Sequence, residues 1–102
     1  MYVSLSHLSI PPERAAELIA AFQGRSRLVE THEGFIDLQV WQSDSDPGRL
    51  VMVSRWRDRG CFKSYMKSRD HRTSHDRIAE PLQSVIRLEA LEHMHTYDVV
   101  AE

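Results

Sequence analysis

Hydrophobic and polar residues alternate along residues 2–9, which is the period of a β-strand. This alternation places His7 on the same face of the strand as two apolar residues. Residues 35–41 and 50–56 are rich in apolar, aromatic and β-branched side chains, which predicts two further strands. The run of Ser, Asp, Pro and Gly at 43–48 predicts a turn, and so short a connection favours an antiparallel hairpin.

The period of the apolar positions changes to three and four residues after Pro12, which predicts a long helix that buries one stripe. We expect this helix to continue through Gly24 as far as Val29, since one glycine weakens a helix without having to end it. A second helix is predicted over residues 58–67, with Asp58 as its N-cap.

The remaining residues predict a short helix and a long strand. The short helix is expected to have Asp70 as its cap and to stop at or just before Pro81, because proline cannot continue a helix. Residues 85–100 then predict the final strand. Its apolar face changes parity near Ala90 and Leu91, which predicts a β-bulge there.

This order of elements is typical of an α+β, ferredoxin-like unit, β-α-β-β-α-α-β, with a four-stranded antiparallel sheet and helices on one face. The other face also carries large apolar residues, so we expect a second subunit to cover it and form a homodimer. Trp41 and Trp56 are expected in the core or at that interface. Residues 1–102 are predicted to form a single domain.

Composition narrows the range of functions. The net charge of -2 gives no basic surface for nucleic acid. The single cysteine, Cys61, excludes an internal disulfide and a cysteine-based metal cluster. Neither an export signal nor a membrane-spanning run is indicated, so we expect a cytoplasmic protein without a membrane partner.

The candidate chemistry lies in the second and third predicted helices, where Tyr65 is followed ten residues later by His75. His71 and His75 are four residues apart, so a helix places them on one face. An imidazole in an apolar cleft can carry a proton or ligate a metal or heme iron. The competing interpretation is a solvated helix surface, because arginines and aspartates surround both histidines.

Three other groups have weaker support. His93 and His95 lie two residues apart and would form a metal site only together with the histidines of the third helix, and no carboxylate or cysteine is placed to complete such a site. His32, at a predicted helix end, is expected to interact with the helix dipole. Cys61 is expected to pack as a small residue rather than to act as a nucleophile.

Several short motifs occur in a characteristic order. Glu33-Gly34-Phe35 begins the second predicted strand, and Val53-Ser54-Arg55-Trp56 ends the third. The following helices carry Phe62, Tyr65, Ser68 and His75. Together these motifs resemble the antibiotic biosynthesis monooxygenase superfamily over nearly the whole chain. The resemblance implies ferredoxin-like subunits that pair face to face into a dimeric α+β barrel.

Within that superfamily the chain is most similar to the heme-degrading, IsdG-like branch. That branch uses an asparagine on the first strand, a tryptophan on the second helix and a histidine ten positions later. The matching positions are His7, Tyr65 and His75, so only the histidine is retained. The resemblance implies that these three residues are catalytic and that His75 is the axial ligand of heme iron. Phe62 and His71 are expected to contact the heme beside Tyr65.

The implied function is an oxygen-dependent monooxygenase that binds heme and, in the fuller form of the hypothesis, degrades it. A second branch oxidises phenols to quinones without metal or flavin, so cofactor-independent oxidation of a phenolic or quinol substrate is the alternative. His7, His75 and Tyr65 would form the polar end of such a pocket. Its aromatic walls would come from Phe35, Trp41, Trp56 and Phe62. A noncatalytic dimeric module that binds a ligand is the third hypothesis, because a fold does not by itself confer a function.

Overall fold

The computed structural model describes residues 1–76, 78–88 and 95–102. Its strands are β1 (Tyr2–Ser9), β2 (Phe35–Gln42), β3 (Arg49–Trp56), β4 (Arg87–Leu88) and β5 (His95–Asp98). Its α-helices are α1 (Ala15–Gln23), α2 (Arg59–Met66), α3 (Arg69–Asp76) and α4 (Glu80–Gln83). Short 3-10 turns are η1 (Pro12–Arg14) and η2 (Leu28–Thr31). Among the described residues, no helix has the length and hydropathy needed to cross a membrane.

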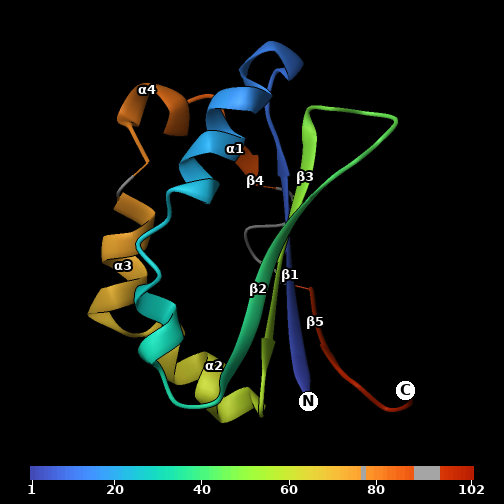
Figure 1. Ribbon diagram of the computed structural model, residues 1–102, viewed down its shortest axis with the longest axis vertical. Coiled ribbons are helices and arrows are strands. Elements are labelled where there is room, and N and C mark those ends of the chain that lie inside the picture. Colours follow the sequence, from blue (N-terminus) through green and yellow to red (C-terminus); the bar gives the residue numbers. More distant parts are fainter. Residues whose placement is uncertain (77, 89–94) are drawn as a thin grey trace.

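The strands form one antiparallel sheet in the order β2, β3, β1, β4. β5 also pairs with β1, along the edge that β4 uses, because β3 occupies the opposite edge over the full length of β1. Figure 1 shows α1, α2, α3 and α4 on one side of this sheet. The arrangement confirms the predicted α+β, ferredoxin-like fold.

The two faces of the sheet differ in what covers them. The face that packs against the helices, here called the helix face, carries the buried residues Tyr2, Ser4 and Leu8 of β1. The opposite face, here called the open face, carries Val3, Leu5 and His7 of the same strand, because side chains alternate along a strand. The pairing of strands continues this face from His7 to Val51 of β3 and Trp41 of β2.

Two clusters of buried side chains join the helices to the helix face. The first consists of Leu8, Ile10, Ala15, Leu18, Leu50 and Leu82, and it anchors α1 and α4. The second consists of Tyr2, Val29, Trp56, Phe62 and Tyr65, and it anchors η2 and α2. Phe62 and Tyr65, two of the residues that are expected to contact heme, thus lie at the aromatic end of the core.

Several local predictions are confirmed. β1 spans the residues that alternate, and β2 and β3 form the expected antiparallel hairpin. The carboxylate of Asp58 accepts the backbone N–H of Cys61 at 2.9 Å, so Asp58 is the N-cap of α2. In the predicted final strand the structure describes two shorter strands, β4 and β5, and the bulge predicted near Ala90 and Leu91 lies outside the described residues.

The prediction of one helix through Gly24 is wrong. α1 ends at Gln23, and the backbone N–H of Gly24 closes the last turn on Ala20. Three residues later Arg27 has a φ angle of 60°, in the left-handed region that a right-handed helix cannot include. The chain then re-enters the core through η2, where Val29 is buried. The segment after Gly24 is therefore a loop with two arginines.

The predicted cap of α3 is also wrong. The helix begins at Arg69, and the hydroxyl of Ser68 accepts the backbone N–H of His71 at 3.2 Å. Asp70 lies in the first turn of the helix, where its carboxylate is available to another partner. Pro81 lies in the first turn of α4, a position that proline tolerates, rather than ending α3.

Candidate functional site

Tyr65 lies at the centre of a cluster of rings between α2, η2 and the helix face. Its side chain is 8% exposed, and its ring centroid is 5.5 Å from that of Trp56 at the end of β3. Two imidazole rings contact it edge-on, His32 at 4.9 Å and His71 at 5.3 Å. The cluster therefore combines aromatic rings with histidine, the side chain that most often ligates a metal or transfers a proton at a functional site.

A chain of hydroxyl groups leads away from Tyr65. The Tyr65 side chain is hydrogen-bonded to Ser74 of α3, whose Oγ is 2.8 Å from the Oγ of Ser26 in the loop after α1. Burial raises the pKa of the Tyr65 phenol, the Ser74 hydrogen bond opposes that rise, Asp70 adds to it and Arg25 opposes it. The phenol therefore stays protonated at neutral pH and can donate a hydrogen bond.

His32 is held by a carboxylate on the neighbouring helix. Its Nε2 lies 2.9 Å from Oδ2 of Asp70. His32 directly follows η2, so it lies at a helix end as expected, and Asp70 is an additional partner of its side chain. Sequence reasoning missed this pair because 38 residues separate the two side chains and no local signal links them.

Phe62, another predicted heme contact, lies at the same end of the core. Phe62 is buried, with its ring centroid 5.6 Å from Tyr2 and 5.8 Å from Trp56. His75 belongs to α3, one helical turn after His71, and its side chain is outside the part that the structure describes. The structure thus brings Phe62, Tyr65 and His71 together and places the His75 backbone next along the same helix.

His7 does not lie with them. Tyr65 packs on Trp56, which pairs with Tyr2 on the helix face, and His7 is an odd number of residues from Tyr2 on the same strand. His7 therefore lies on the open face, and the expectation of one pocket shared by His7 and Tyr65 is wrong within a single chain. The β1 residue that faces the helices at this level is Ser6, one residue earlier.

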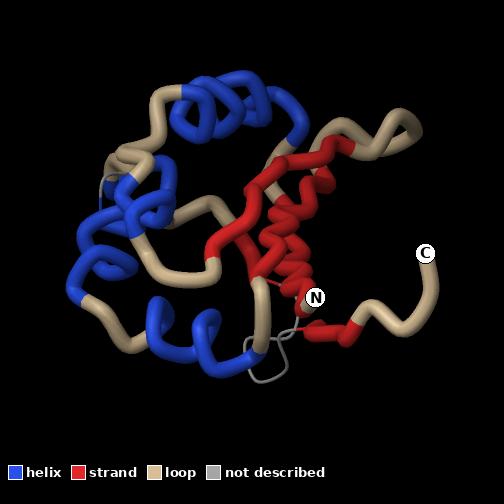
Figure 2. Tube along the Cα trace, turned by 60° about the horizontal axis from the view of Figure 1, so that its bottom comes forward, coloured by secondary structure: helices blue, strands red, loops and turns tan. Residues whose placement is uncertain are grey.

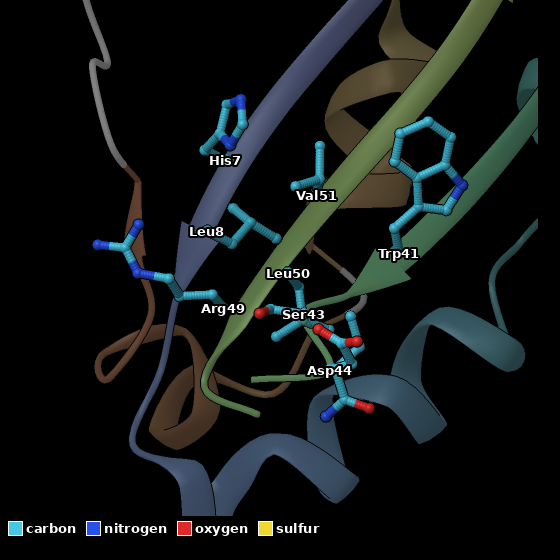
Figure 3. Close-up of a pocket in the computed structure, with 9 residues that line it drawn as sticks. His7, Leu8, Trp41, Ser43, Asp44, Arg49, Leu50 and Val51 are labelled. Carbon is cyan, nitrogen blue, oxygen red and sulfur yellow. The ribbon is translucent and has the colours of Figure 1, made fainter. Parts of the chain in front are cut away.

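The surroundings of His7 form a shallow hollow on the open face. His7, Val51 and Trp41 project side by side from β1, β3 and β2, as Figure 3 shows. The hollow has a volume of about 590 Å³, and Arg49 lies at its edge. The ring of His7 meets that of His95 edge-on, with centroids 5.3 Å apart. This site is separated from Tyr65 by the sheet itself.

A second concavity, here called the α1–β2 cleft, lies on the helix face and was not predicted. Its volume is about 560 Å³, within the range of small-molecule sites. Its apolar walls are Ile19 and Phe22 from α1, Leu38 and Val40 from β2, and Leu50 from β3. Arg25 and Arg27 form its charged end. The sequence does contain a signal for this cleft, namely Gly24. A helix that ends at Gly24 leaves Arg25 and Arg27 in the loop that follows it.

The structure bears on the weaker candidates as well. In residues 1–76, 78–88 and 95–102, no group of three His, Cys, Asp or Glu side chains is arranged to hold a metal ion, and His93 lies outside this part. Cys61 packs against the aromatic cluster, and burial raises the pKa of its thiol. The position of Cys61 agrees with the expectation that it packs as a small residue.

Comparison with known proteins gives the family. A family model described as antibiotic biosynthesis monooxygenase matches residues 1–77. The chain therefore belongs to the antibiotic biosynthesis monooxygenase family, as its motifs indicated. No curated protein matches the chain.

Solved structures with this fold include proteins with different cofactor requirements. The heme-degrader MhuD from Mycobacterium tuberculosis, solved with two hemes in its active site, is 19% identical with a TM-score of 0.80, over 100% of this chain and 98% of that chain. SnoaB, a cofactor-independent oxygenase from Streptomyces nogalater, is 12% identical with a TM-score of 0.74, over 99% and 94%. A conserved protein from Methanosarcina mazei Go1 is 19% identical with a TM-score of 0.71, over 94% and 89%. These likenesses establish the fold and leave the reaction to be argued from the site.

Proposed function

We propose that the protein is an oxygen-dependent monooxygenase that works as a homodimer and binds heme on its helix face, with His75 as the axial ligand of the iron. One observation supports this most: the Tyr65 cluster gathers aromatic rings and imidazoles at the α2 and α3 helices, one turn before His75. Flat apolar walls beside a histidine are the groups that a heme site needs.

The residues present fit heme in kind. Tyr65 and Phe62 supply ring surfaces, and the imidazole of His32 is already engaged by Asp70, which leaves α3 to supply the axial ligand. Both rings are buried, so we expect this end of the core to open when heme binds. Bound heme would supply the iron at which oxygen is activated.

The polar donor on the first strand is then Ser6 rather than His7. Ser6 shares its parity with the buried residues Ser4 and Leu8 and faces the helices, whereas His7 faces away. A serine hydroxyl can donate one hydrogen bond, which is the role that the heme branch gives to an asparagine amide at this level of the strand.

The open face supports the homodimer. Trp41 is 47% exposed and Tyr97 is 52% exposed on this face, beside Val3, Leu5 and Val51. Figure 2 shows that the helices lie on one side of the sheet and leave the other to the β2–β3 loop and the C-terminal tail. A second sheet packed on these side chains would remove an apolar patch from water. We propose the cytoplasm as the compartment, since the single cysteine allows no internal disulfide of the kind that oxidising compartments favour.

Hemin titration tests the proposal. Adding hemin to the pure protein should shift the Soret band, and the His75→Ala variant should lose that shift. His95→Ala is the matched control because His95 is an exposed histidine on the open face, and it should keep the shift. A wild-type protein that gives no Soret shift, or an unchanged shift in His75→Ala, contradicts heme ligation by His75.

Turnover then separates degradation from binding. With an electron donor and oxygen present, a degrading enzyme loses the Soret band as the macrocycle opens, while a binding protein keeps it. Persistence of the band through prolonged turnover conditions would assign the protein to heme binding alone.

The α1–β2 cleft favours a second candidate, cofactor-independent oxidation of a phenolic or quinol substrate. The cleft has apolar walls for an aromatic ring, and Arg25 and Arg27 would stabilise the phenolate that such a reaction needs. Oxygen uptake with hydroxylated naphthalenes, in the presence of a metal chelator, is the discriminating measurement. Oxygen uptake that requires added hemin would exclude this candidate. A protein that is inactive both in this assay and in the hemin turnover assay would leave the noncatalytic ligand-binding module as the remaining hypothesis.

A further inference from the structure

The charged end of the α1–β2 cleft is built from two arginines that share one counterion. Arg25 Nη2 and Arg27 Nη1 lie 2.8 Å and 3.0 Å from the same oxygen, Oε1 of Glu30. Two guanidinium groups and one carboxylate carry a net charge of +1. The side chain of Arg25 is 22% exposed, so part of this charge is screened less than a surface charge would be.

The backbone between the two arginines is held before any ligand arrives. Ser26, between the two arginines, points to α3 and is hydrogen-bonded to Ser74 at 2.8 Å. Its Oγ also accepts the backbone N–H of Leu28 at 3.4 Å, while Arg27 holds its left-handed conformation. The arginines on either side of Ser26 both line the cleft. A loop whose backbone is ordered in advance loses less entropy when it binds a ligand, although the Arg27 side chain itself is 64% exposed.

The apolar part of the cleft determines what else the ligand must carry. Side chains of Ile19, Phe22, Leu38 and Val40 form apolar walls, and Gln23 and Gln42 also line the cleft with amide groups. An ion without an apolar body would gain nothing from the apolar walls, and an apolar body without an anion would leave the charge uncompensated. A cation would be repelled by the net positive charge at the end.

We propose that the α1–β2 cleft binds an apolar aromatic carboxylate, whose ring lies between α1 and β2 and whose carboxylate lies at Arg25 and Arg27. Glu30 occupies the guanidinium groups in the free protein and gives up part of this contact when the ligand binds. The inference rests on the part of the proposed function that places the ligand on the helix face of the sheet. It holds whether or not heme takes part in the reaction.

The cleft and the Tyr65 cluster are also coupled electrostatically. Arg25 opposes the rise in the pKa of Tyr65, so its charge is felt at that phenol. A bound carboxylate would neutralise part of the Arg25 charge, and the pKa of Tyr65 should then rise. The ligand is therefore detectable at Tyr65 without any enzymatic activity.

Binding of two matched probes tests the proposal. The probes are 2-naphthoate and the neutral amide naphthalene-2-carboxamide, which have the same ring and nearly the same shape. Calorimetric titration of the full chain should show the acid binding at least about tenfold more tightly than the amide, a ratio that corresponds to about 1.4 kcal/mol. This preference should shrink with added salt, as an ionic contact requires.

Three variants locate the anion. The double variant Arg25→Met with Arg27→Met should reduce the preference for the acid to near parity while leaving binding of the amide in place, which shows that the cleft is still folded. Glu30→Gln should strengthen binding of 2-naphthoate, because it removes the competing carboxylate. Arg14→Met is the control, since Arg14 pairs with Glu17 and does not line the cleft.

Equal affinities of the acid and the amide for the wild-type protein would overturn the proposal, as would failure of both to bind. A preference for the acid that survives the double variant would also overturn it. These outcomes are separate from the hemin titration: a protein without a Soret shift that prefers 2-naphthoate through its arginines disproves heme ligation and supports this inference.

Discussion

The two faces of the sheet use the same strands for different purposes. On the helix face, Trp56 is 1% exposed and contacts the rings of Phe35, Phe62 and Tyr65. On the open face, Trp41 is 47% exposed in a shallow hollow beside Val51. One tryptophan completes a core, and the other lies exposed on the open face. The difference shows that residue type alone does not assign a role, because the parity of the strand position decides it.

The largest difference between the two faces is expected when each tryptophan is replaced in turn by alanine. Trp56→Ala leaves a large cavity in the aromatic cluster and should cost about 3–5 kcal/mol of unfolding free energy. Trp41→Ala should change the stability of the monomer by less than about 0.5 kcal/mol. Chemical denaturation of both variants at low protein concentration checks the difference. Similar losses for the two would mean that the open face is already covered within one chain.

A charge placed on the open face should break the dimer and spare the fold. Val51→Asp puts a carboxylate in the middle of the proposed interface, opposite His7 in the strand pairing, and should weaken association by about tenfold or more. Sedimentation velocity measures the shift from dimer to monomer, and circular dichroism verifies that the subunit is folded. Sedimentation of the wild-type protein as a monomer at all concentrations would contradict the proposed interface.

Ser26→Ala tests how the loop after α1 holds the helix face together. The variant removes the hydrogen bond to Ser74 and should lower stability by about 1 kcal/mol. It should also weaken binding of 2-naphthoate several-fold, because the backbone between the two arginines is then held less firmly. Thermal unfolding and calorimetry measure the two effects. If the variant is less stable but binds 2-naphthoate as tightly as wild type, the hydrogen bond of Ser26 does not contribute to binding in the cleft.

The phenol of Tyr65 reports the charges around it. Asp70→Asn removes a negative charge that raises the pKa of Tyr65, so this pKa should fall; Arg25→Met removes a positive charge that lowers it, so it should rise. Ultraviolet absorbance of the tyrosinate, followed against pH, gives both values, and Tyr65→Phe identifies the signal. Shifts in the same direction for both variants would contradict the arrangement of charges.

The smallest effect is expected at the cap of α2. The pKa of Asp58 is lowered, first by the hydrogen bond from the Cys61 N–H, so its ionised form stabilises the fold above its unfolded pKa of about 3.9. That contribution is lost as pH falls through the lower folded value. Asp58→Ala should therefore reduce Tm by a few degrees at neutral pH. The difference from wild type should shrink in acid, and a constant difference across pH would exclude ionisation as the cause.

Local patterns were sufficient to predict most of the fold. The alternation over residues 2–9, the turn at 43–48 and Asp58 each act within a few residues, and each produced the expected element. Gly24 is ambiguous in the sequence, because glycine occurs both inside helices and at their C-terminal ends. The left-handed Arg27 is the feature that decides the matter.

The site was predicted less completely, for a different physical reason. Tyr65, Phe62 and His71 are close in the sequence, and they are close in the structure. Contacts such as His32 with Asp70 depend on how distant elements pack, which no local pattern reveals. The alignment matches His7 with the asparagine of the heme-degrading branch. An offset of one residue along a strand is enough to move a side chain to the opposite face of the sheet.

The central claim is that the ligand site lies on the helix face, and methyl NMR with hemin tests it most directly. Ferric iron broadens the signals of nearby methyl groups. The account predicts broadening at Val29 and Leu38, which pack in the aromatic cluster, with sharp signals at Leu5 and Val51 of the open face. Broadening at Leu5 and Val51 while Val29 and Leu38 stay sharp would place the site around His7 and contradict the account.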